Sequence, residues 1–451
     1  MKKESWHSRV GFMMAAAGSA VGLANIWRFP YMVGANGGGI FVILYLMCLL
    51  LIGIPVFIAE ILIGRETQLS PSGAFQKLGK SKLWSLMGKF TILTGFLVSS
   101  FYCAVAGWIL GYLVEAIQGK LTLFATGAEA LERFNTLVGS PVWAVGFHMI
   151  FMMICIGVLL FGVKKGIERS SKVMMPALYI LLILLVIRGV TLPGASKGLS
   201  FLLKPDWSQA TPIAILTALG QAFFTLSLGQ GTMVTYGSYL RHKDNIVTSC
   251  LPVVAMDTLV SLFAAVAVMT IVFSAGMAPS AGPALLFETL PFIFSKMTGG
   301  YFLALGFFLL VLLAAITSQI SALEPVIAYL VGEKKWHRHP ATLVAASVSF
   351  IVGVPSALSF GVMKGVTVGG ATFFDIISNL CTDIMIPLGG LLAVILVGWV
   401  WGVTSAVKGL RRGAEEMFDR FPILRTYFWF CFKIGAPTLI VVVFLHATGV
   451  L

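Results

Sequence analysis

Charged residues are the scarcest class in this sequence. They make up 11% of the 451 residues, whereas 58% are hydrophobic and the mean hydropathy is +0.96. An ordinary soluble domain has about 25% charged and about 45–50% apolar residues. The scarcity of charge therefore excludes a water-soluble globule. Because about 20 apolar residues cross a bilayer, this length accommodates about ten to twelve membrane-spanning helices.

Cysteine and histidine are also rare, with six residues of each. The cysteines all lie inside apolar segments without metal-ligand spacing, so the sequence predicts neither a disulfide framework nor a zinc site. The chain has no P-loop and no Ser-His-Asp arrangement, and we expect it not to be an enzyme. Its net charge of +13 comes from short loops rather than from one basic domain. We therefore expect membrane lipid as a partner, but no nucleic acid and no obligate protein partner.

Apolar runs of spanning length predict an all-α membrane protein with eleven transmembrane helices. The predicted spans lie near 11–34, 40–64, 88–118, 142–163, 173–190, 211–240, 248–273, 301–331, 340–360, 374–402 and 426–449. With the N-terminus cytoplasmic, 22 of the 31 lysines and arginines fall in the inner termini and loops. This asymmetry predicts that orientation. The odd number of spans then places the C-terminus outside.

Two of the predicted spans are interrupted near their middle. The first contains Gly18 to Asn25, and the sixth contains Ser227 to Thr232, both rich in glycine and polar residues. Irregular backbone is tolerated at membrane depth only where it lines an enclosed cavity. Interruptions at corresponding positions of two halves predict a transporter site near the bilayer midplane. The alternative is that the glycines only allow close helix packing, which explains one such cluster well but two in register poorly.

These two interruptions also carry a family resemblance. The stretch GSAVGLANIWRFPYMVGANGGG at 18–39 and the stretch QAFFTLSLGQGTMVTYGSY at 221–239 resemble the neurotransmitter:sodium symporters, especially the bacterial amino-acid transporters. The resemblance implies a single transporter domain over residues 1–451, built as an inverted five-plus-five helix repeat with broken first and sixth helices. The first repeat would cover 11–190 and the second 211–402, followed by an eleventh helix at 426–449.

The resemblance implies two sodium sites made of oxygen ligands, the type that a hard cation prefers. The first site falls on Ala20, Asn25, Thr225 and Asp257, with the substrate carboxylate as a further ligand. The second falls on Gly18, Val21, Ala314, Thr317 and Ser318. Positions 314, 317 and 318 share one helix face. Taken alone, Thr317 and Ser318 are better explained by hydrogen bonds to their own helix, and the companion motif in the first span reverses that preference.

Asp257 departs from the pattern of the bacterial leucine-type transporters, which resemble this chain but carry Asn at this place and Glu one turn later, where Ser261 stands here. In chloride-dependent members of the family the anion supplies negative charge close to this point. A fixed carboxylate would replace that anion. We therefore expect transport that does not depend on chloride. Proton countertransport through Asp257 is a further hypothesis.

The resemblance also implies a substrate pocket. It falls on Leu23, Ala24, Val98, Tyr102, Phe224, Ser227, Gln230, Ser318 and Ala322. We expect free backbone N–H groups at 22–24 to bind a carboxylate, with Tyr102 bonding it and Phe224 closing over it. Gly22 stands where monoamine carriers place Asp, which favours a complete amino acid. The amide of Gln230 in an apolar pocket favours a neutral, hydrophobic substrate, extending to aromatic side chains with a polar atom; the alternative is that Gln230 bonds only the unwound backbone.

Gate residues follow from the same resemblance. Arg28 and Asp375, assisted by Gln221, would form an outer salt bridge, and Lys3, Trp6, Ser238 and Tyr239 an inner gate. The inner acidic partner expected for Lys3 is replaced by Gly332, with Glu333 following. Glu60 is expected to bond unwound backbone, a structural role. Glu324 and Asp383 also lie inside predicted spans, and the sequence assigns no role to either.

Together these features predict a symporter in the bacterial inner membrane. It would couple inward sodium, with two ions expected, to import of a neutral amino acid by alternating access. Two alternatives remain, a non-transporting sodium-dependent amino-acid sensor with the same fold and an ion channel. A sensor would bind the amino acid with sodium but not accumulate it, and a channel would lack the two gates.

Overall fold

The computed structural model describes residues 4–277 and 285–447. The α-helices are α1 (Arg9–Ala20), α2 (Phe29–Ala35), α3 (Gly39–Cys48), α4 (Ile54–Thr67), α5 (Pro71–Gly79), α6 (Lys82–Ile117), α7 (Gly127–Gly139), α8 (Pro141–Leu160), α9 (Arg169–Val190), α10 (Ala195–Leu203), α11 (Pro212–Thr225), α12 (Thr232–Ser238), α13 (Ile246–Ser274), α14 (Leu290–Lys296), α15 (Gly300–Gly332), α16 (Arg338–Leu358), α17 (Phe373–Asn379), α18 (Ile386–Ile395), α19 (Val403–Arg411), α20 (Glu415–Arg420), α21 (Ile423–Phe430) and α22 (Ala436–Ala447).

Short helices of other types join these elements. The π-helices are η1 (Ala24–Arg28), η2 (Leu49–Gly53), η4 (Val163–Glu168), η6 (Leu285–Thr289), η7 (Leu380–Met385), η8 (Leu396–Val400) and η9 (Cys431–Gly435); the 3₁₀ helices are η3 (Lys120–Thr122) and η5 (Trp207–Gln209). One detail departs from an all-α chain, because β1 (Thr367–Val368) pairs with β2 (Ala371–Thr372) in a small antiparallel ribbon. Two glycines with positive φ, Gly369 and Gly370, form its turn.

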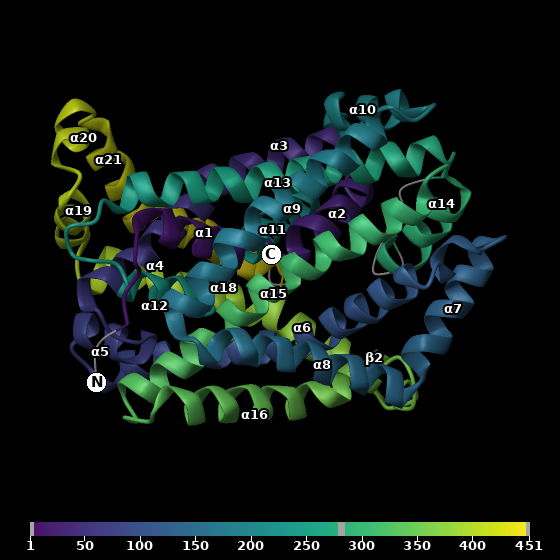
Figure 1. The fold of residues 1–451 in the computed structure, drawn as a ribbon. Coiled ribbons are helices and arrows are strands. Elements are labelled where there is room, and N and C mark those ends of the chain that lie inside the picture. Colours follow the sequence, from purple (N-terminus) through teal and green to yellow (C-terminus); the bar gives the residue numbers. More distant parts are fainter. Residues whose placement is uncertain (1–3, 278–284, 448–451) are drawn as a thin grey trace.

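The chain is a largely helical membrane protein. In the described ranges, eight helices are long and apolar enough to span a membrane, and a ninth span results if Arg9–Ala20 and Ala24–Ala35 are counted as one. The predicted sixth span corresponds to α11 and α12, and the predicted eleventh to α21, η9 and α22. The long helices lie roughly side by side between one end that carries α5, α19 and α20 and another that carries α7, α10 and α14 (Figure 1). We call these ends the inner and the outer face, following the predicted topology.

Both predicted interruptions are breaks in the helices. The first span bends by 50° between α1 and η1. The sixth unwinds over 226–231, between α11 and α12. Three residues of this stretch have positive φ, namely Ser227, Gly229 and Gly231. Ser227 lies in the left-handed region at +53°, which is uncommon for a residue with a Cβ, and its hydroxyl donates to the Ser19 carbonyl at 2.9 Å.

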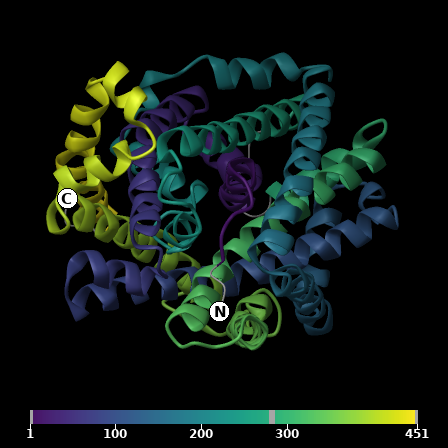
Figure 2. The same cartoon turned by 60° about the vertical axis from the view of Figure 1, so that its left-hand side comes forward.

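The broken first span occupies the middle of the bundle. Figure 2 shows its helices in purple with other helices around them. Helix α1 packs against α9, α13 and α15, and α12 packs against α4. Glycine allows the second contact, because a Cβ on Gly64 would lie 2.0 Å from the Val234 carbonyl oxygen. The two unwound stretches therefore meet inside the protein, where enclosed carbonyl and N–H groups can bind ligands.

Candidate functional site

A cavity lies between the two unwound stretches. Its volume is about 30 Å³. All nine predicted substrate residues line it, together with Ser19, Ala20 and Gly22. Phe224 also lines a second, larger cavity of about 520 Å³. The larger cavity is bounded by Trp27 and Arg28 of η1, Tyr31 and Met32 of α2, and residues of α11, α17 and η7. Phe224 therefore stands between the predicted pocket and a vestibule on the outer side.

The expectation of free N–H groups at 22–24 is wrong for two of the three residues. The Gly22 N–H donates to Asn25 Oδ1 at 2.9 Å, and the Leu23 N–H donates to the Tyr102 hydroxyl at 3.4 Å. Unwinding removed their helical acceptors, and nearby side chains took the place of these acceptors. The Tyr102 hydroxyl lies at the predicted carboxylate end of the pocket.

Gly22 leaves no room for a side chain. A Cβ there would lie 2.4 Å from Ser318 Oγ and 3.1 Å from the Tyr102 hydroxyl oxygen. Any larger residue at this position would fill the carboxylate end of the pocket. The glycine therefore keeps space beside two hydroxyl groups, which is compatible with a substrate that brings its own carboxylate.

Three of the four residues predicted for the first sodium site, Asn25, Thr225 and Asp257, meet in one buried network, while the fourth, Ala20, lines the pocket. The Asn25 Nδ2 lies within hydrogen-bond distance of three acceptors, Thr225 Oγ1 and Asp257 Oδ1 at 2.7 Å and Ser261 Oγ at 2.9 Å, among which its two N–H groups are shared. The Thr225 hydroxyl donates to both carboxylate oxygens of Asp257 at 3.0 Å. Asn25, Thr225 and Asp257 are each 0% exposed. Sequence reasoning did not place Ser261 in this network.

This donor set fits a monovalent hard cation. In the described part of the chain the donors to the Asp257 carboxylate are neutral groups. A buried carboxylate without a basic partner is costly and is stabilised by a bound cation. No cluster of three or more His, Cys, Asp or Glu that could hold a metal ion occurs in residues 4–277 and 285–447. The oxygens that meet here are a carboxylate, hydroxyls and an amide, a pattern suited to sodium rather than to a transition metal.

The residues predicted for the second sodium site also converge, where α1 ends against α15. The Ser318 hydroxyl lies 3.2 Å from the Val21 carbonyl oxygen and 3.3 Å from that of Ser19. The Thr317 hydroxyl donates back to the Ala314 carbonyl at 3.0 Å. A Cβ on Gly18 would lie 3.2 Å from Thr317 Cβ, so only a small residue allows this approach. Carbonyl and hydroxyl oxygens from two helices thus face each other.

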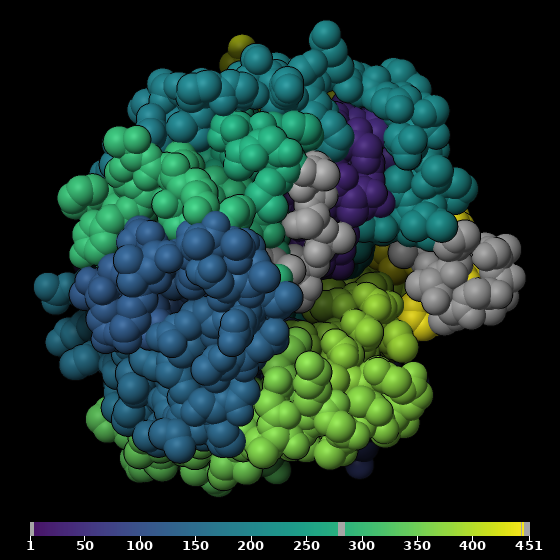
Figure 3. Space-filling view, turned by 90° about the vertical axis from the view of Figure 1, so that its right-hand side faces the viewer, coloured from purple at the N-terminus to yellow at the C-terminus, as the bar shows by residue number. Residues whose placement is uncertain are grey.

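The predicted outer ion pair is not formed. Arg28 Nη1 donates to Gln221 Oε1 at 2.9 Å, and its guanidinium lies 5.3 Å from the centre of the Phe224 ring. The Asp375 carboxylate instead caps its own helix α17, accepting from the Thr372 N–H at 3.0 Å and the Thr372 hydroxyl at 2.7 Å. Arg28 and Asp375 both line the 520 Å³ vestibule, which separates them here. Figure 3 shows the outer face, where N-terminal residues (purple) come to the surface between the surrounding segments.

The inner side is closed around Trp6. This side chain is 4% exposed, its indole N–H donates to the Tyr236 carbonyl at 3.0 Å, and its backbone N–H donates to the Tyr239 carbonyl at 3.2 Å. The Ser238 hydroxyl bonds its own helix at Thr235. Lys3 lies outside the described residues. The vestibule leaves the outer side open, and the buried Trp6 closes the inner side, so this conformation is open outward and closed inward.

Two carboxylates at the inner side have partners that the sequence did not reveal. Arg338 donates to Glu324 Oε1 at 3.0 Å and Oε2 at 2.8 Å, and the Tyr239 hydroxyl donates to Oε1 at 2.7 Å. Glu333 accepts from the Gly73 N–H at 2.9 Å and from the hydroxyls of Ser70 and Ser72. Glu333 thus caps α5. No spacing rule connects Glu324 to Arg338, because a loop and two helix ends separate them.

Glu60 lies where the expected structural role requires it. Its Oε1 accepts from the Gly229 N–H at 2.7 Å, and the residue is 1% exposed. Gly229 has a φ of +71°, and a Cβ there would lie 2.0 Å from the Ile386 carbonyl oxygen. Helix α4 thereby supplies an acceptor for the unwound part of the sixth span. Asp383 lies on the vestibule wall, with its Oδ1 bonded by Thr382 at 2.8 Å.

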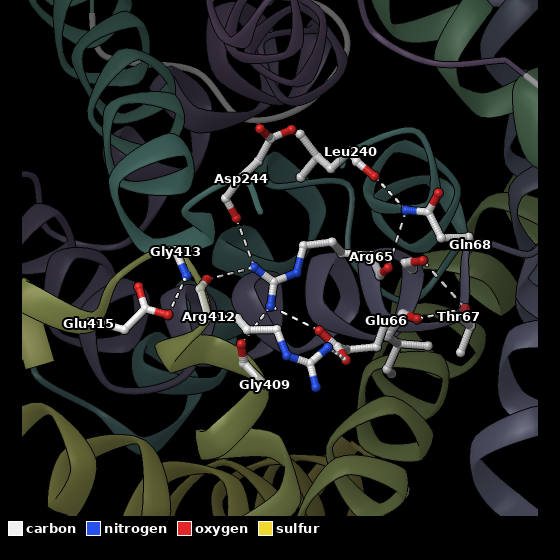
Figure 4. Close-up of polar contacts among 12 residues, drawn as sticks. Arg65, Glu66, Thr67, Gln68, Leu240, Asp244, Gly409, Arg412, Gly413 and Glu415 are labelled. Atoms are coloured by element: carbon white, nitrogen blue, oxygen red, sulfur yellow. Dashed lines mark hydrogen bonds and ion pairs between the residues drawn. The ribbon is translucent and has the colours of Figure 1, made fainter. Parts of the chain in front are cut away.

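Arg65 joins three segments at the inner face (Figure 4). It is 0% exposed and donates to the carbonyls of Asp244 at 2.7 Å and Gly409 at 2.5 Å, and to the Glu66 carboxylate at 2.9 Å. Arg412 bonds the other oxygen of Glu66 at 2.9 Å. The guanidinium therefore ties the end of α4 to the α12–α13 loop and to the end of α19. The sequence gives no signal for this role, because Arg65 stands where an apolar run ends and polar residues follow.

Comparisons with known proteins agree with this geometry. The sequence model described as "Sodium:neurotransmitter symporter family" matches residues 3–133 and 123–450. An uncharacterized sodium-dependent transporter of Bacillus subtilis (strain 168), YhdH, is 39% identical over all of this chain and 99% of its own length. A second uncharacterized sodium-dependent transporter, from Haemophilus influenzae, is 34% identical, with 98% of each chain covered.

A solved structure is also similar. The crystal structure of MhsT in complex with L-phenylalanine superimposes with a TM-score of 0.90 and 39% sequence identity, covering 98% of this chain and 99% of MhsT. The two broken helices, the buried oxygen network and these relatives lead to one assignment. The chain belongs to the sodium:neurotransmitter symporter family and is a sodium-dependent membrane transporter.

Proposed function

We propose that this transporter is a symporter that carries a neutral, hydrophobic or aromatic amino acid into the cell together with sodium. The pocket between the broken helices is the substrate site, and the two oxygen clusters beside it hold two sodium ions. Tyr102 and the backbone at Gly22 and Leu23 receive the substrate carboxylate. The structural relative MhsT, which was solved with L-phenylalanine, supports a substrate of this class.

The observation that carries this proposal is the position of Asn25. Its side chain bonds the Gly22 N–H at the pocket and also bonds Thr225 and Asp257 in the ion network. An ion that draws the Asn25 oxygen toward itself would release the Gly22 N–H for a substrate carboxylate. Binding of sodium and binding of substrate would then each strengthen the other by the same factor.

Alternating access follows from the two gates. In the outward-open arrangement, substrate passes Arg28 and Phe224 and reaches the pocket. Closure would bring Arg28 to Asp375 across the vestibule, with Gln221 holding the guanidinium in place. Release of Trp6 from the carbonyls of Tyr236 and Tyr239 would open the inner path. We place the chain in the bacterial inner membrane, with the N-terminus cytoplasmic and the C-terminus outside, and the helix repeats at 11–190 and 211–402.

Chloride is not part of this cycle. The Asp257 carboxylate already supplies a fixed negative charge within the first ion network, so no anion is needed there to balance sodium. The nearby Ser261 hydroxyl completes the network as an uncharged acceptor of the Asn25 amide.

The experiment that tests this function is uptake by purified protein in liposomes. An inward sodium gradient is compared with a matched potassium gradient, with the twenty amino acids competing against a labelled mixture. We expect accumulation only with sodium, and competition by neutral amino acids with large side chains. Tight sodium-dependent binding without accumulation would instead identify a sensor, and uptake of sodium without any amino acid would identify a channel.

A further inference from the structure

The substrate pocket has two chemically different ends along α6. Tyr102, Val98 and Gly95 lie on one face of this helix, at positions separated by four and three residues. The Tyr102 hydroxyl marks the end beside Gly22 and Ser318. At the other end, a Cβ on Gly95 would lie 2.7 Å from the carbonyl oxygen of Gln230 and 3.3 Å from that of Ala322. Gly95 thus lets the unwound backbone at Gln230 approach α6.

The distance between the two ends follows from helix geometry. With a rise of about 1.5 Å per residue, Gly95 lies about 10 Å from Tyr102 along α6, and Ala322 lies about 6 Å from Ser318 along α15. A substrate carboxylate at Tyr102 therefore directs its side chain toward Gln230 and Ala322. Only a long side chain can reach that far end, so the short polar side chains of serine and threonine fall short of Gln230.

Gln230 is the polar exception at this far end. It is 7% exposed, and its Oε1 is buried without a hydrogen-bond partner in the described part of the chain. Ala322, whose carbonyl approaches Gly95 as that of Gln230 does, and Val98, one turn along α6 from Gly95, are apolar cavity residues at this end, whereas Leu23 lies at the Tyr102 end. A buried amide oxygen without a donor is costly, and such atoms are rare in native proteins. If Gln230 only bonded the unwound backbone, a backbone N–H would donate to this oxygen. No backbone N–H in the described ranges does so.

Resting on the proposed function, we propose that Gln230 selects neutral amino acids that carry a hydrogen-bond donor at the far end of an otherwise apolar side chain. The phenol O–H of tyrosine and the indole N–H of tryptophan have this chemistry. Phenylalanine and leucine fill the same space but leave the amide oxygen unpaired. The phenol of tyrosine can also accept a hydrogen bond. It can therefore pair with the Gln230 amide whether the amide presents its oxygen or its NH₂ group.

Room for such a side chain must come from movement. The cavity of about 30 Å³ is too small for an aromatic ring. Phe224 is the movable wall, since it separates this cavity from the vestibule of about 520 Å³. Ala322 is small, so the far end itself needs little adjustment. The polar selection by Gln230 is therefore separate from the size of the pocket.

The test is a comparison of tyrosine with phenylalanine in sodium-dependent binding by the purified full chain in detergent. Labelled tyrosine is displaced by either amino acid, with wild type, Gln230→Met and Gln230→Glu. Methionine keeps the volume but removes the amide, whereas glutamate keeps an acceptor. We expect wild type and Gln230→Glu to bind tyrosine about tenfold or more tightly than phenylalanine. Gln230→Met should weaken the binding of tyrosine and strengthen that of phenylalanine, so that the ratio of the two affinities comes close to one.

Gln319→Met is the matched control. Gln319 is also a buried glutamine with an unpaired Oε1, but its Nε2 donates to Ser99 at 2.8 Å and it does not line the pocket. The ratio of tyrosine affinity to phenylalanine affinity in Gln319→Met should equal that of wild type. An equal ratio in wild type and Gln230→Met, or a wild type that prefers phenylalanine, would overturn the proposal. Binding without accumulation in liposomes would contradict the symporter, while the binding ratio would still decide the role of Gln230.

Discussion

Arg338 at the start of α16 donates to both carboxylate oxygens of Glu324, at 3.0 and 2.8 Å, deep in α15. Glu324 is 0% exposed, while the Arg338 side chain is 15% exposed. The same carboxylate accepts from the Tyr239 hydroxyl, and Tyr239 holds Trp6 through its carbonyl. The ion pair therefore connects two helices of the inner side to the segment that closes it.

Removing one partner of this pair should be more harmful than removing both. Arg338→Met leaves the buried Glu324 carboxylate unpaired, a loss of about 3–5 kcal/mol in a protein interior. We expect a lower apparent unfolding temperature in detergent for Arg338→Met. The double variant Arg338→Met with Glu324→Gln removes both charges and should recover most of the loss. Equal destabilisation of the single and the double variant would show that the pair is not the source of the effect.

Chloride should have no influence on transport. Because Asp257 supplies the negative charge of the first ion network, initial uptake rates in chloride and in gluconate should agree within the error of the assay. Asp257→Asn should weaken the apparent sodium affinity at least about tenfold, since a charge-assisted contact to the ion is lost. Asp419→Asn, which removes a surface carboxylate paired with Arg411 and Arg425, serves as the control. Uptake that collapses in gluconate would disprove chloride independence.

A single methyl group at Gly22 should abolish substrate binding. The added Cβ of Gly22→Ala would lie 2.4 Å from Ser318 Oγ, which forces either the unwound backbone or Ser318 to move. We expect no measurable sodium-dependent amino-acid binding by this variant in a scintillation assay. Gly306→Ala on α15 is the control, because its Cβ would meet no atom within 4 Å. Wild-type affinity in Gly22→Ala would mean that the pocket lies elsewhere.

Arg65 should be essential for the inner-face junction in Figure 4. Arg65→Gln leaves the carbonyls of Asp244 and Gly409 and the Glu66 carboxylate without their buried donor. A lysine cannot replace the planar fork of donors, so Arg65→Lys should be nearly as harmful. Hydrogen exchange should rise in 240–245 and 403–413 for both variants. Arg169→Gln at an exposed position of α9, outside both segments, provides the comparison. Unchanged exchange in Arg65→Gln would refute the role of the junction.

The sequence predicted those features that depend on local chemistry. Glycine and polar residues at mid-span predicted the two broken helices, and the family resemblance identified the residues that meet at Asn25 and around the pocket. Pairings that depend on how distant helices pack could not be read in this way. Glu324 with Arg338 and Glu333 with α5 are such pairings. The predicted Arg28–Asp375 ion pair is absent for another reason, because its formation depends on the conformation of the vestibule.

In the proposed mechanism, sodium and the amino acid bind in mutual dependence through Asn25. The most direct test measures substrate affinity at low and at saturating sodium, and sodium affinity with and without substrate, on the same purified protein. Both affinities should change by the same factor, of at least about fivefold. Asn25→Ala should remove this coupling. Substrate affinity that is the same with sodium and with potassium would exclude the mechanism.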